Sequence, residues 1–161
     1  MRTIIGVMGT GQPIDPPAQT VARLLGKLIA EEGWVTLTGG RASGVMDACS
    51  RGAHEAGGLV LGVLPDATAD GASSYIDIAI RTGMGDARNV VNVLSSDVVI
   101  ALPGGSGTLS EVALALKSGK PVIVVGWDPG AAMRASGRVI DAHDPHEAIE
   151  LTRQSLARRR P

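Results

Sequence analysis

The chain has 161 residues and a formal net charge of −1, and it is rich in glycine (22 residues) and poor in aromatic residues (two Trp, one Tyr, no Phe). This length fits a single domain, 1–161, since domains commonly have about 100 to 200 residues. The near-neutral charge offers no basic field for a nucleic-acid backbone, and so few rings cannot form a stacking platform for bases. The sequence has no apolar run of about 18 residues that could span a membrane, no signal-peptide pattern, and a single cysteine, Cys49, which excludes an internal disulfide. We therefore expect a soluble cytoplasmic protein that binds neither nucleic acid nor a membrane.

Short apolar runs alternate with segments of helical periodicity along the chain. The runs predicted as strands are 3–8, 34–37, 59–64, 75–80, 97–102, 121–125 and 139–142. The segments predicted as helices, from apolar spacing and capping residues, are 15–33, 43–56, 86–94, 108–118 and one that begins at 144. This alternation predicts a single-domain, Rossmann-like α/β fold in three layers, with a parallel sheet between two layers of helices. Right-handed crossovers then bring every strand-to-helix loop to the same edge of the sheet.

Three glycine-rich segments follow predicted strands, and we expect them to meet at that edge. Glycine lets backbone N–H groups approach an anion closely, and the start of a helix favours phosphate. Ligands of doubly wound sheets bind at the carboxyl ends of the strands. The sequence therefore predicts a small phosphate-bearing ligand there. The predicted binding residues from these segments are Gly9, Thr10, Gly11, Gly39, Gly40, Gly104, Gly105, Ser106, Gly107 and Thr108.

Missing motifs narrow the ligand class. The first segment reads GTGQPI and so lacks the third glycine of G-x-G-x-x-G. The second predicted strand ends in Leu37-Thr38, without the carboxylate that binds the ribose of NAD. The chain also lacks the G-x-x-x-x-G-K-[ST] sequence of P-loop NTPases. A mononucleotide or a sugar phosphate fits these features better than a dinucleotide.

Glu111 is the carboxylate nearest to the third glycine segment. Thr108 and Glu111 have the T-x-x-E spacing of a capping box, and the pattern alone favours that structural role. The alternative is that the Glu111 carboxylate faces the ligand, where it could activate water or stabilise developing positive charge.

Three further charged residues are candidates for the same edge. Arg88 lies in the first turn of a predicted helix, where a cation opposes the helix dipole, so it needs another partner. That partner is either an anionic ligand or a carboxylate, Asp86 or Glu111. Arg41 follows the second glycine segment and could reach the ligand, although the pattern favours an exposed loop arginine. Asp47 could bind a ribose hydroxyl or simply stabilise the start of its own helix.

Other catalytic arrangements have no support in the sequence. Cys49 is interpreted as a small buried residue and not as a nucleophile, and the G-x-S-x-G elbow of serine hydrolases is absent. The three histidines have no zinc-ligand spacing with the cysteine or with each other, so no metal site is predicted.

Two of the glycine segments resemble the signatures of a known family. Pro103-Gly-Gly-Ser-Gly-Thr-Leu-Ser-Glu111 matches the P-G-G-x-G-T-x-x-E motif of the Lonely-guy family, and residues 39–46 are similar to its second signature, within a similarity over about residues 3–126. The resemblance implies a Rossmann-like fold and hydrolysis of the N-glycosidic bond of cytokinin nucleoside 5′-monophosphates to free base and ribose 5-phosphate. It also implies that Arg88 and Glu111 are the catalytic pair, that the loop 104–108 cradles the phosphate, that no cofactor is required, and that the protein is a homo-oligomer (dimer or tetramer).

Two departures from that pattern resemble a short bacterial subgroup. Arg88 is followed by Asn89 and not by Lys, and Met46 is followed by Asp47 and not by Gly. This subgroup is also similar to the molybdenum cofactor carrier proteins, which share the fold and the glycine loops but bind a phosphate-bearing pterin without turning it over. The sequence thus supports two hypotheses, a nucleoside 5′-monophosphate phosphoribohydrolase, which it slightly favours, and a non-catalytic carrier of molybdenum cofactor or a nucleotide. A lysine decarboxylase, an older label for the family, is excluded because no lysine lies at the carboxyl end of a predicted strand to form a Schiff base with pyridoxal phosphate.

Overall fold

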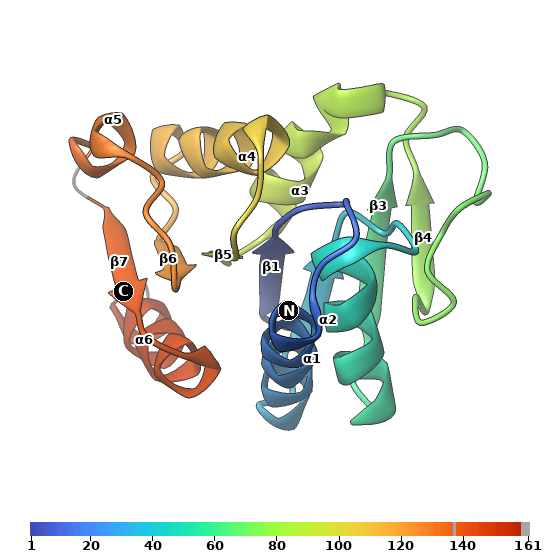
Figure 1. Cartoon of the computed structure of the whole chain (residues 1–161), viewed down its shortest axis with the longest axis horizontal. Coiled ribbons are helices and arrows are strands. Elements are labelled where there is room, and N and C mark those ends of the chain that lie inside the picture. The colour runs from blue at the N-terminus through green and yellow to red at the C-terminus, as the bar shows by residue number, and fades with distance from the viewer. Residues whose placement is uncertain (137, 159–161) are drawn as a thin grey trace.

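The computed structural model describes residues 1–136 and 138–158, and within them seven parallel strands form one sheet (Figure 1). In chain order the strands are β1 (Ile4–Met8), β2 (Val35–Thr38), β3 (Val60–Leu64), β4 (Ile78–Arg81), β5 (Val98–Ala101), β6 (Val122–Val125) and β7 (Val139–Ala142). Their order across the sheet is β4-β3-β2-β1-β5-β6-β7, so the direction in which strands are added reverses between β1 and β5. This topology confirms the predicted Rossmann-like α/β fold and places a switch point, the usual ligand position, beside β1.

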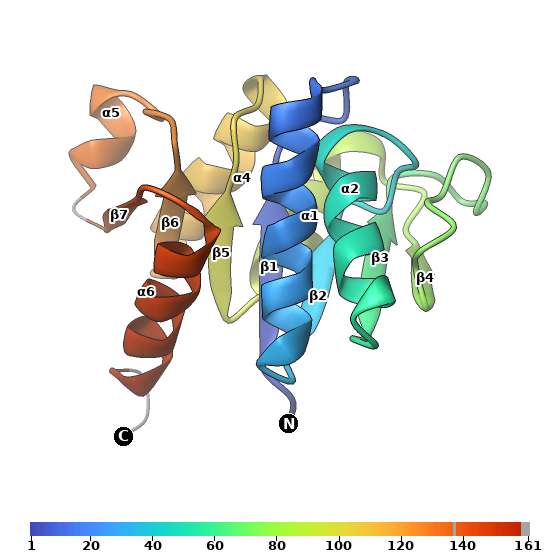
Figure 2. The same cartoon turned by 60° about the horizontal axis from the view of Figure 1, so that its bottom comes forward.

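Helices cover both faces of the sheet (Figure 2). They are α1 (Pro16–Glu31), α2 (Gly44–Glu55), the 3₁₀ turn η1 (Gly85–Arg88), α3 (Asn89–Ser95), α4 (Ser106–Lys117), α5 (Ala131–Arg134) and α6 (Pro145–Ala157). Helices α1, α2 and α6 lie on one face, and α3 and α4 lie on the other. The strand-to-helix loops therefore open at one edge, as the sequence predicts.

Alternating side chains of β1 divide the core into two clusters. Ile5 and Val7 are fully buried against the α1, α2 and α6 face, whereas Met8 packs in the cluster on the α3 and α4 face. This is the two-residue period of a strand covered on both sides. Burying each such side chain contributes about 1.5–3 kcal/mol, so the central strands form a firm base for the loops at their carboxyl ends.

Several predicted boundaries need correction. The strand predicted at 75–80 begins later, at Ile78, because Ile76 N–H bonds to Ser73 carbonyl in a turn and Asp77 bonds to Val60 through both its N–H and its carboxylate. The single helix predicted at 86–94 is a 3₁₀ turn followed by a short α-helix. The helix predicted to begin at Thr108 begins at Ser106, and this shift changes the interpretation of the site.

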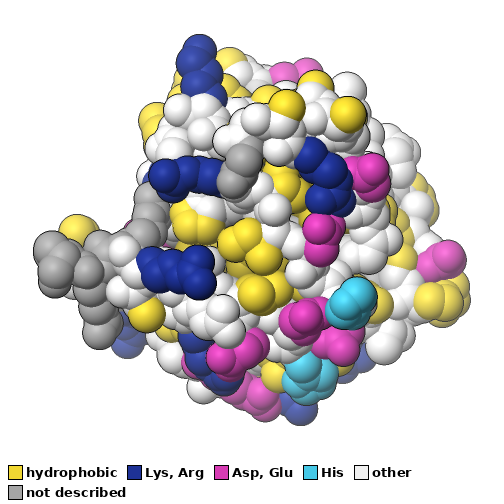
Figure 3. All heavy atoms as spheres, turned by 90° about the vertical axis from the view of Figure 1, so that its left-hand side faces the viewer, with side chains coloured by type: hydrophobic (Ala, Val, Ile, Leu, Met, Phe, Trp, Pro, Cys, Tyr) yellow, Lys and Arg dark blue, Asp and Glu magenta, His cyan; other side chains and the backbone are white. Residues whose placement is uncertain are grey.

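The surface beside β7 and α6 carries both signs of charge (Figure 3). Arg134 forms ion pairs with Asp128 and Asp141, at 2.7 and 2.8 Å. Arg153 likewise pairs with acidic partners on this side. None of the helices in the described residues has the length and apolar character needed to cross a membrane.

Candidate functional site

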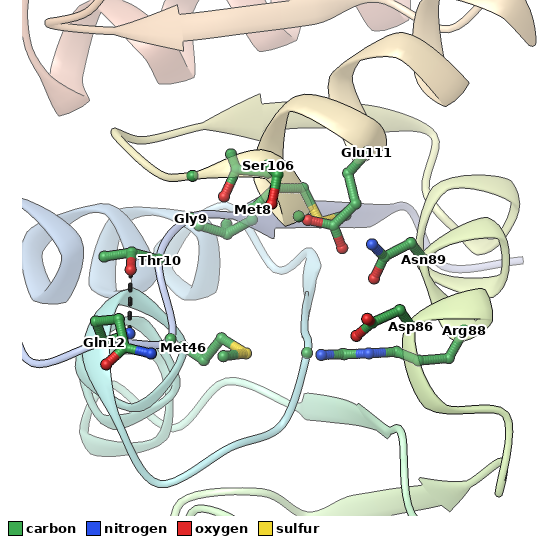
Figure 4. Close-up of a pocket in the computed structure, with 16 residues that line it drawn as sticks. Met8, Gly9, Thr10, Gln12, Met46, Asp86, Arg88, Asn89, Ser106 and Glu111 are labelled. Carbon is green, nitrogen blue, oxygen red and sulfur yellow. Dashed lines mark hydrogen bonds between the residues drawn. The ribbon is translucent and has the colours of Figure 1, made fainter.

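A pocket of about 260 Å³ lies at the carboxyl ends of β1 and β2, beside the starts of α3 and α4 (Figure 4). Its lining joins all three predicted glycine segments: Val7, Met8, Gly9, Thr10, Gly11, Gln12, Gly39, Met46, Asp86, Arg88, Asn89, Gly105, Ser106, Gly107, Thr108 and Glu111. Asp86, Arg88 and Asn89 line one side, and Thr10, Gln12 and Met46 lie opposite. The structure thus brings together most of the residues that the sequence predicts for the ligand.

Backbone hydrogen bonds fasten the three loops to one another. Thr10 N–H donates to Pro103 carbonyl at 3.3 Å, and Val45 N–H donates to Thr10 carbonyl at 2.9 Å. Gly44 must be a glycine at this junction, because its φ is +62° and an added Cβ would lie 2.2 Å from Thr10 carbonyl oxygen. Thr10 Oγ1 in turn accepts from Gln12 N–H at 3.0 Å. These bonds connect the three loops directly to one another.

Residues 105–108, at the start of α4, line this pocket. Asp15 and Asp144 cap α1 and α6 with their side chains, whereas Gly105, at the N-cap of α4, provides no such bond. The first-turn N–H groups of a helix need an acceptor, and a phosphate oxygen supplies one with favourable charge. The start of α4 therefore has the geometry that suits an anion.

The capping box predicted for Thr108 and Glu111 is wrong, because α4 begins two residues before Thr108. Thr108 is a buried residue of the first turn, 3% exposed, and Glu111 belongs to the next turn. Gly104 leaves room for this arrangement, since an added Cβ there would lie 2.0 Å from Thr108 Oγ1. The alternative interpretation, that the Glu111 side chain faces the ligand site, agrees with the structure.

Glu111 is buried at the rear of the pocket, with 7% of its surface exposed. Its Oε1 accepts a hydrogen bond from Asn92 Nδ2 at 2.7 Å. Burial raises the pKa of Glu111 from its ordinary 4.5 to about 7, against the opposing effects of the Asn92 hydrogen bond and the Arg88 charge. Glu111 therefore changes charge close to neutral pH, as groups at functional sites often do.

Arg88 is the last residue of η1, and its guanidinium lies near the carboxyl end of β3. Its Nη1 donates to Val63 carbonyl at 2.6 Å, and its buried Nε has no hydrogen-bond partner among the described residues. An added Cβ at Gly39 would lie 2.3 Å from Nη1, so the glycine makes room for the arginine. Burial lowers the pKa of Arg88, with the charge of Glu111 opposing this, yet an arginine stays protonated in proteins. The described part of the chain shows no ion pair from Arg88 to Asp86 or to Glu111, so its charge is available to a ligand.

Four predicted binding residues do not line this pocket. Asp47 accepts from Ser73 Oγ at 2.7 Å and lines a neighbouring hollow between α1 and α2. Arg41 forms an ion pair with Asp66 at 3.2 Å. Gly40 packs closely against Leu64 and Gly62 of β3, and Gly104 packs against Thr108. Cys49 is buried in the core, which raises its thiol pKa to about 12 and agrees with its interpretation as a packing residue.

Sequence reasoning missed Asn92, which holds Glu111, and named Asn89 only as a departure from the family pattern. Asn89 lines the pocket, and its Nδ2 donates to Ser110 Oγ at 2.9 Å. A signal for Asn92 was present: it is a polar residue in the apolar run Val90–Leu94, four residues after Arg88 and so on the same helical face. No sequence pattern predicted that Met8 and Met46 would line the pocket with apolar side chains. Residues 1–136 and 138–158 contain no group of three or more His, Cys, Asp or Glu placed to hold a metal ion.

Several known proteins resemble this chain in structure or in sequence. The chain superposes on a molybdenum cofactor binding protein from Rippkaea orientalis with a TM-score of 0.91 and 49% identity, over 97% of this chain and 98% of that one. The molybdenum cofactor carrier protein of Chlamydomonas reinhardtii gives a TM-score of 0.90 and 45% identity, over 98% and 99% of the two chains. A cytokinin riboside 5′-monophosphate phosphoribohydrolase of Mycobacterium tuberculosis is 30% identical over 140 residues, which is 81% of this chain and 75% of that enzyme.

The chain also matches plant phosphoribohydrolases, but the matched segment covers only 33% to 50% of the length of each of them. A family model, described as the SLOG cluster4 family, matches residues 2–153. These findings confirm the predicted resemblance to the Lonely-guy family and to the molybdenum cofactor carriers. The chain belongs to the SLOG cluster4 family.

Proposed function

We propose that this protein is a carrier that binds the molybdenum cofactor, a phosphate-bearing pterin, as cargo and does not turn it over. The observation that carries the proposal is the pocket itself, where the start of α4, which has no side-chain cap, and the positive charge of Arg88 line a space suited to an anion. The similarity over nearly the whole chain to proteins described as molybdenum cofactor binding or carrier proteins supports this choice of cargo. The hydrolase hypothesis, which the sequence slightly favours, becomes the second candidate.

The described residues fit the phosphate end of such a cargo. Gly39 and Gly107 leave the pocket open where side chains would fill it, and the backbone of the 105–108 segment faces the ligand. A volume of about 260 Å³ accommodates a phosphate and an attached ring. A second hollow, of about 550 Å³, shares Asp86, Asn89, Ser106 and Gly107 with this pocket, so the rest of a longer ligand can extend along α3 and α4.

The state of Glu111 suits a site that holds a phosphate. A hydrolase of this kind needs an ionised carboxylate near the sugar to stabilise an oxocarbenium-like transition state or to activate water. Glu111 is buried and bonded to Asn92, and its raised pKa of about 7 keeps part of the population neutral near pH 7. A neutral carboxyl group does not repel the phosphate of the cargo.

A hydrolase remains the second candidate because Arg88 and Glu111 line the same pocket as the glycine loops. In that reaction Arg88 and the 105–108 loop would hold the 5′-phosphate, and ionised Glu111 would stabilise positive charge at C1′. The M. tuberculosis relative carries the name of such an enzyme.

Two assays on the same preparation separate the candidates. Purified protein is titrated with molybdenum cofactor, and in parallel it is incubated with adenosine and cytokinin riboside 5′-monophosphates while free base is measured. The carrier proposal expects saturable cofactor binding and no free base above that of Glu111→Gln. Base release that disappears in Glu111→Gln, together with no cofactor binding, would establish the hydrolase in its place.

We also propose that the protein is a homo-oligomer, as the family resemblance implies. Light scattering of the purified chain measures the mass directly. A mass near 16.4 kDa, that of a single chain, would contradict this expectation.

A further inference from the structure

A buried polar network connects the middle of the sheet to the pocket through α3. Asn92 is fully buried, and its Nδ2 donates to Glu111 Oε1 at 2.7 Å. Its backbone carbonyl accepts from Ser96 Oγ, also at 2.7 Å. Gly6 of β1 leaves space for this network, since an added Cβ there would lie 2.2 Å from Ser96 Oγ.

An asparagine at position 92 lowers the stability of the fold. It lies in an apolar helix with Val91 and Val93 beside it, and its Oδ1 is buried without a hydrogen-bond partner among the described residues. A buried carbonyl oxygen without a partner costs about 1–3 kcal/mol, and an apolar side chain of similar shape would avoid that cost. A local violation of this kind is typical of a functional site.

We propose that Asn92 is a positioning residue for this site: its carboxamide fixes the orientation of the Glu111 carboxyl and sets the charge that Glu111 presents to the bound phosphate ligand. The effect on ligand affinity rests on the proposed function of the pocket. The effect on Glu111 itself does not, because the hydrogen bond is present without a ligand.

A carboxamide suits this role because it carries both a donor and an acceptor. When Glu111 is ionised, Asn92 Nδ2 donates to the carboxylate, as the structure shows. When Glu111 is protonated, a half-turn of the Asn92 amide presents Oδ1, the unpartnered atom, to accept the acid proton. The same residue therefore serves both charge states, and the hydrogen bond to the ionised state limits how far burial raises the pKa of Glu111.

Few other charges act on this carboxyl group. The charged side chains that line the pocket with Glu111 are Arg88 and Asp86, both from η1. The described lining residues from β1, from α3 and from the start of α4 are uncharged. Burial favours the neutral form of Glu111, whereas the Asn92 hydrogen bond and the Arg88 charge favour the ionised form.

The test begins without any ligand. The Glu111 carboxyl is titrated by carbon NMR, and the Glu111→Gln spectrum identifies its signal. Asn92→Leu keeps the shape of the side chain but removes the donor, so we expect the pKa of Glu111 to rise by about one unit or more. The matched control is Ser96→Ala, which removes a buried hydrogen bond of the same length from the same helix but leaves the donor to Glu111 in place. We expect this control to change stability without moving the Glu111 titration.

Asn92→Asp provides a second variant if Asn92→Leu does not fold. Two carboxyl groups at this separation share one proton, so a titration well above pH 7 is expected from the pair. A Glu111 titration that is the same in the parent protein, in Asn92→Asp and in every folded Asn92→Leu sample would overturn the positioning role. Equal shifts in Asn92→Leu and Ser96→Ala would also overturn it, because they would indicate a general structural effect.

The ligand arm uses adenosine 5′-monophosphate as the probe, between pH 6 and 8. The ratio of its Kd for the parent protein to its Kd for Glu111→Gln cancels the titration of the probe's own phosphate. We expect this ratio to rise several-fold as Glu111 ionises and the midpoint of the rise to move to higher pH in Asn92→Leu. A midpoint unmoved in Asn92→Leu would refute the link to affinity. If the probe does not bind at all, the proposed function loses support while the ligand-free titration still decides the role of Asn92.

Discussion

Two hollows border the segment between β1 and α1. Both are lined by arginines and carboxylates, but these charged groups are paired differently in the two hollows. The hollow between α1 and α2 is the larger, about 410 Å³ against 260 Å³ for the glycine-loop pocket, and it contains a carboxylate, Asp47, and two arginines, Arg23 and Arg51. There both arginines pair with Glu55, and Asp47 holds Ser73. In the smaller pocket Arg88 Nε has no partner among the described residues and Glu111 is buried.

The difference shows that size and charge do not by themselves mark a ligand site. Exposed ion pairs such as that of Arg51, whose side chain is 46% exposed, contribute little and are already satisfied. Buried groups without a partner cost free energy that a ligand can recover. We therefore expect ligands to bind the glycine-loop pocket in preference to the larger hollow, and the following variants test that expectation.

The largest expected effect is on stability, through the buried carboxyl of Glu111. Its pKa is about 7 in the fold against an ordinary 4.5, so between these values the unfolded chain is ionised and the folded one is neutral. The free energy of unfolding therefore falls as pH rises through this range and levels off above about pH 7, by at most about 3 kcal/mol. Urea unfolding at pH 5 and pH 8 should show this loss in the parent protein and not in Glu111→Gln. Equal pH dependence of the two proteins would contradict the burial argument.

The next effect is on ligand affinity, through the two kinds of arginine. Arg88→Met removes the positive charge from the lining of the pocket, so the Kd for adenosine 5′-monophosphate should rise about 30-fold, roughly 2 kcal/mol. Arg51→Met, the control in the larger hollow, should change it less than about 2-fold. Calorimetry gives both constants, and thermal unfolding checks that each variant is folded. Similar losses in the two variants would remove the distinction between the hollows.

The smallest effect is expected at Asp47, which the sequence predicts as a ribose ligand. Its carboxylate accepts from Ser73 outside the glycine-loop pocket. Asp47→Asn keeps an acceptor for that bond, so the affinity for the same nucleotide should change less than about 2-fold. A loss of tenfold or more would show that the ligand reaches across into the larger hollow.

The sequence predicts the scaffold of this site better than its chemistry. Glycines at strand ends identify the three loops, because the parallel topology brings every such loop to one edge. Arg88 and Glu111 were both identified, but the role of Glu111 depended on where α4 begins. The extended backbone of Gly105 starts the helix two residues early, and no local pattern reveals that.

The remaining features depend on contacts between distant segments. Asn92 reaches Glu111 across 19 residues of sequence, and only the packing of α3 on α4 makes it a partner. Asp47 was predicted in the pocket because it follows the second glycine loop closely. It lies outside because Ser73, from a segment 26 residues away, takes its carboxylate.

The most direct test of the carrier proposal measures what the protein holds. The chain is expressed in cells that make molybdenum cofactor, purified, and analysed for bound pterin by fluorescence after oxidative release, with Arg88→Met alongside. We expect close to one phosphorylated pterin per chain in the parent protein, a large loss in the variant, and no free base from adenosine 5′-monophosphate. A parent protein that carries no pterin but releases adenine, and that loses this activity in Glu111→Gln, would contradict the account.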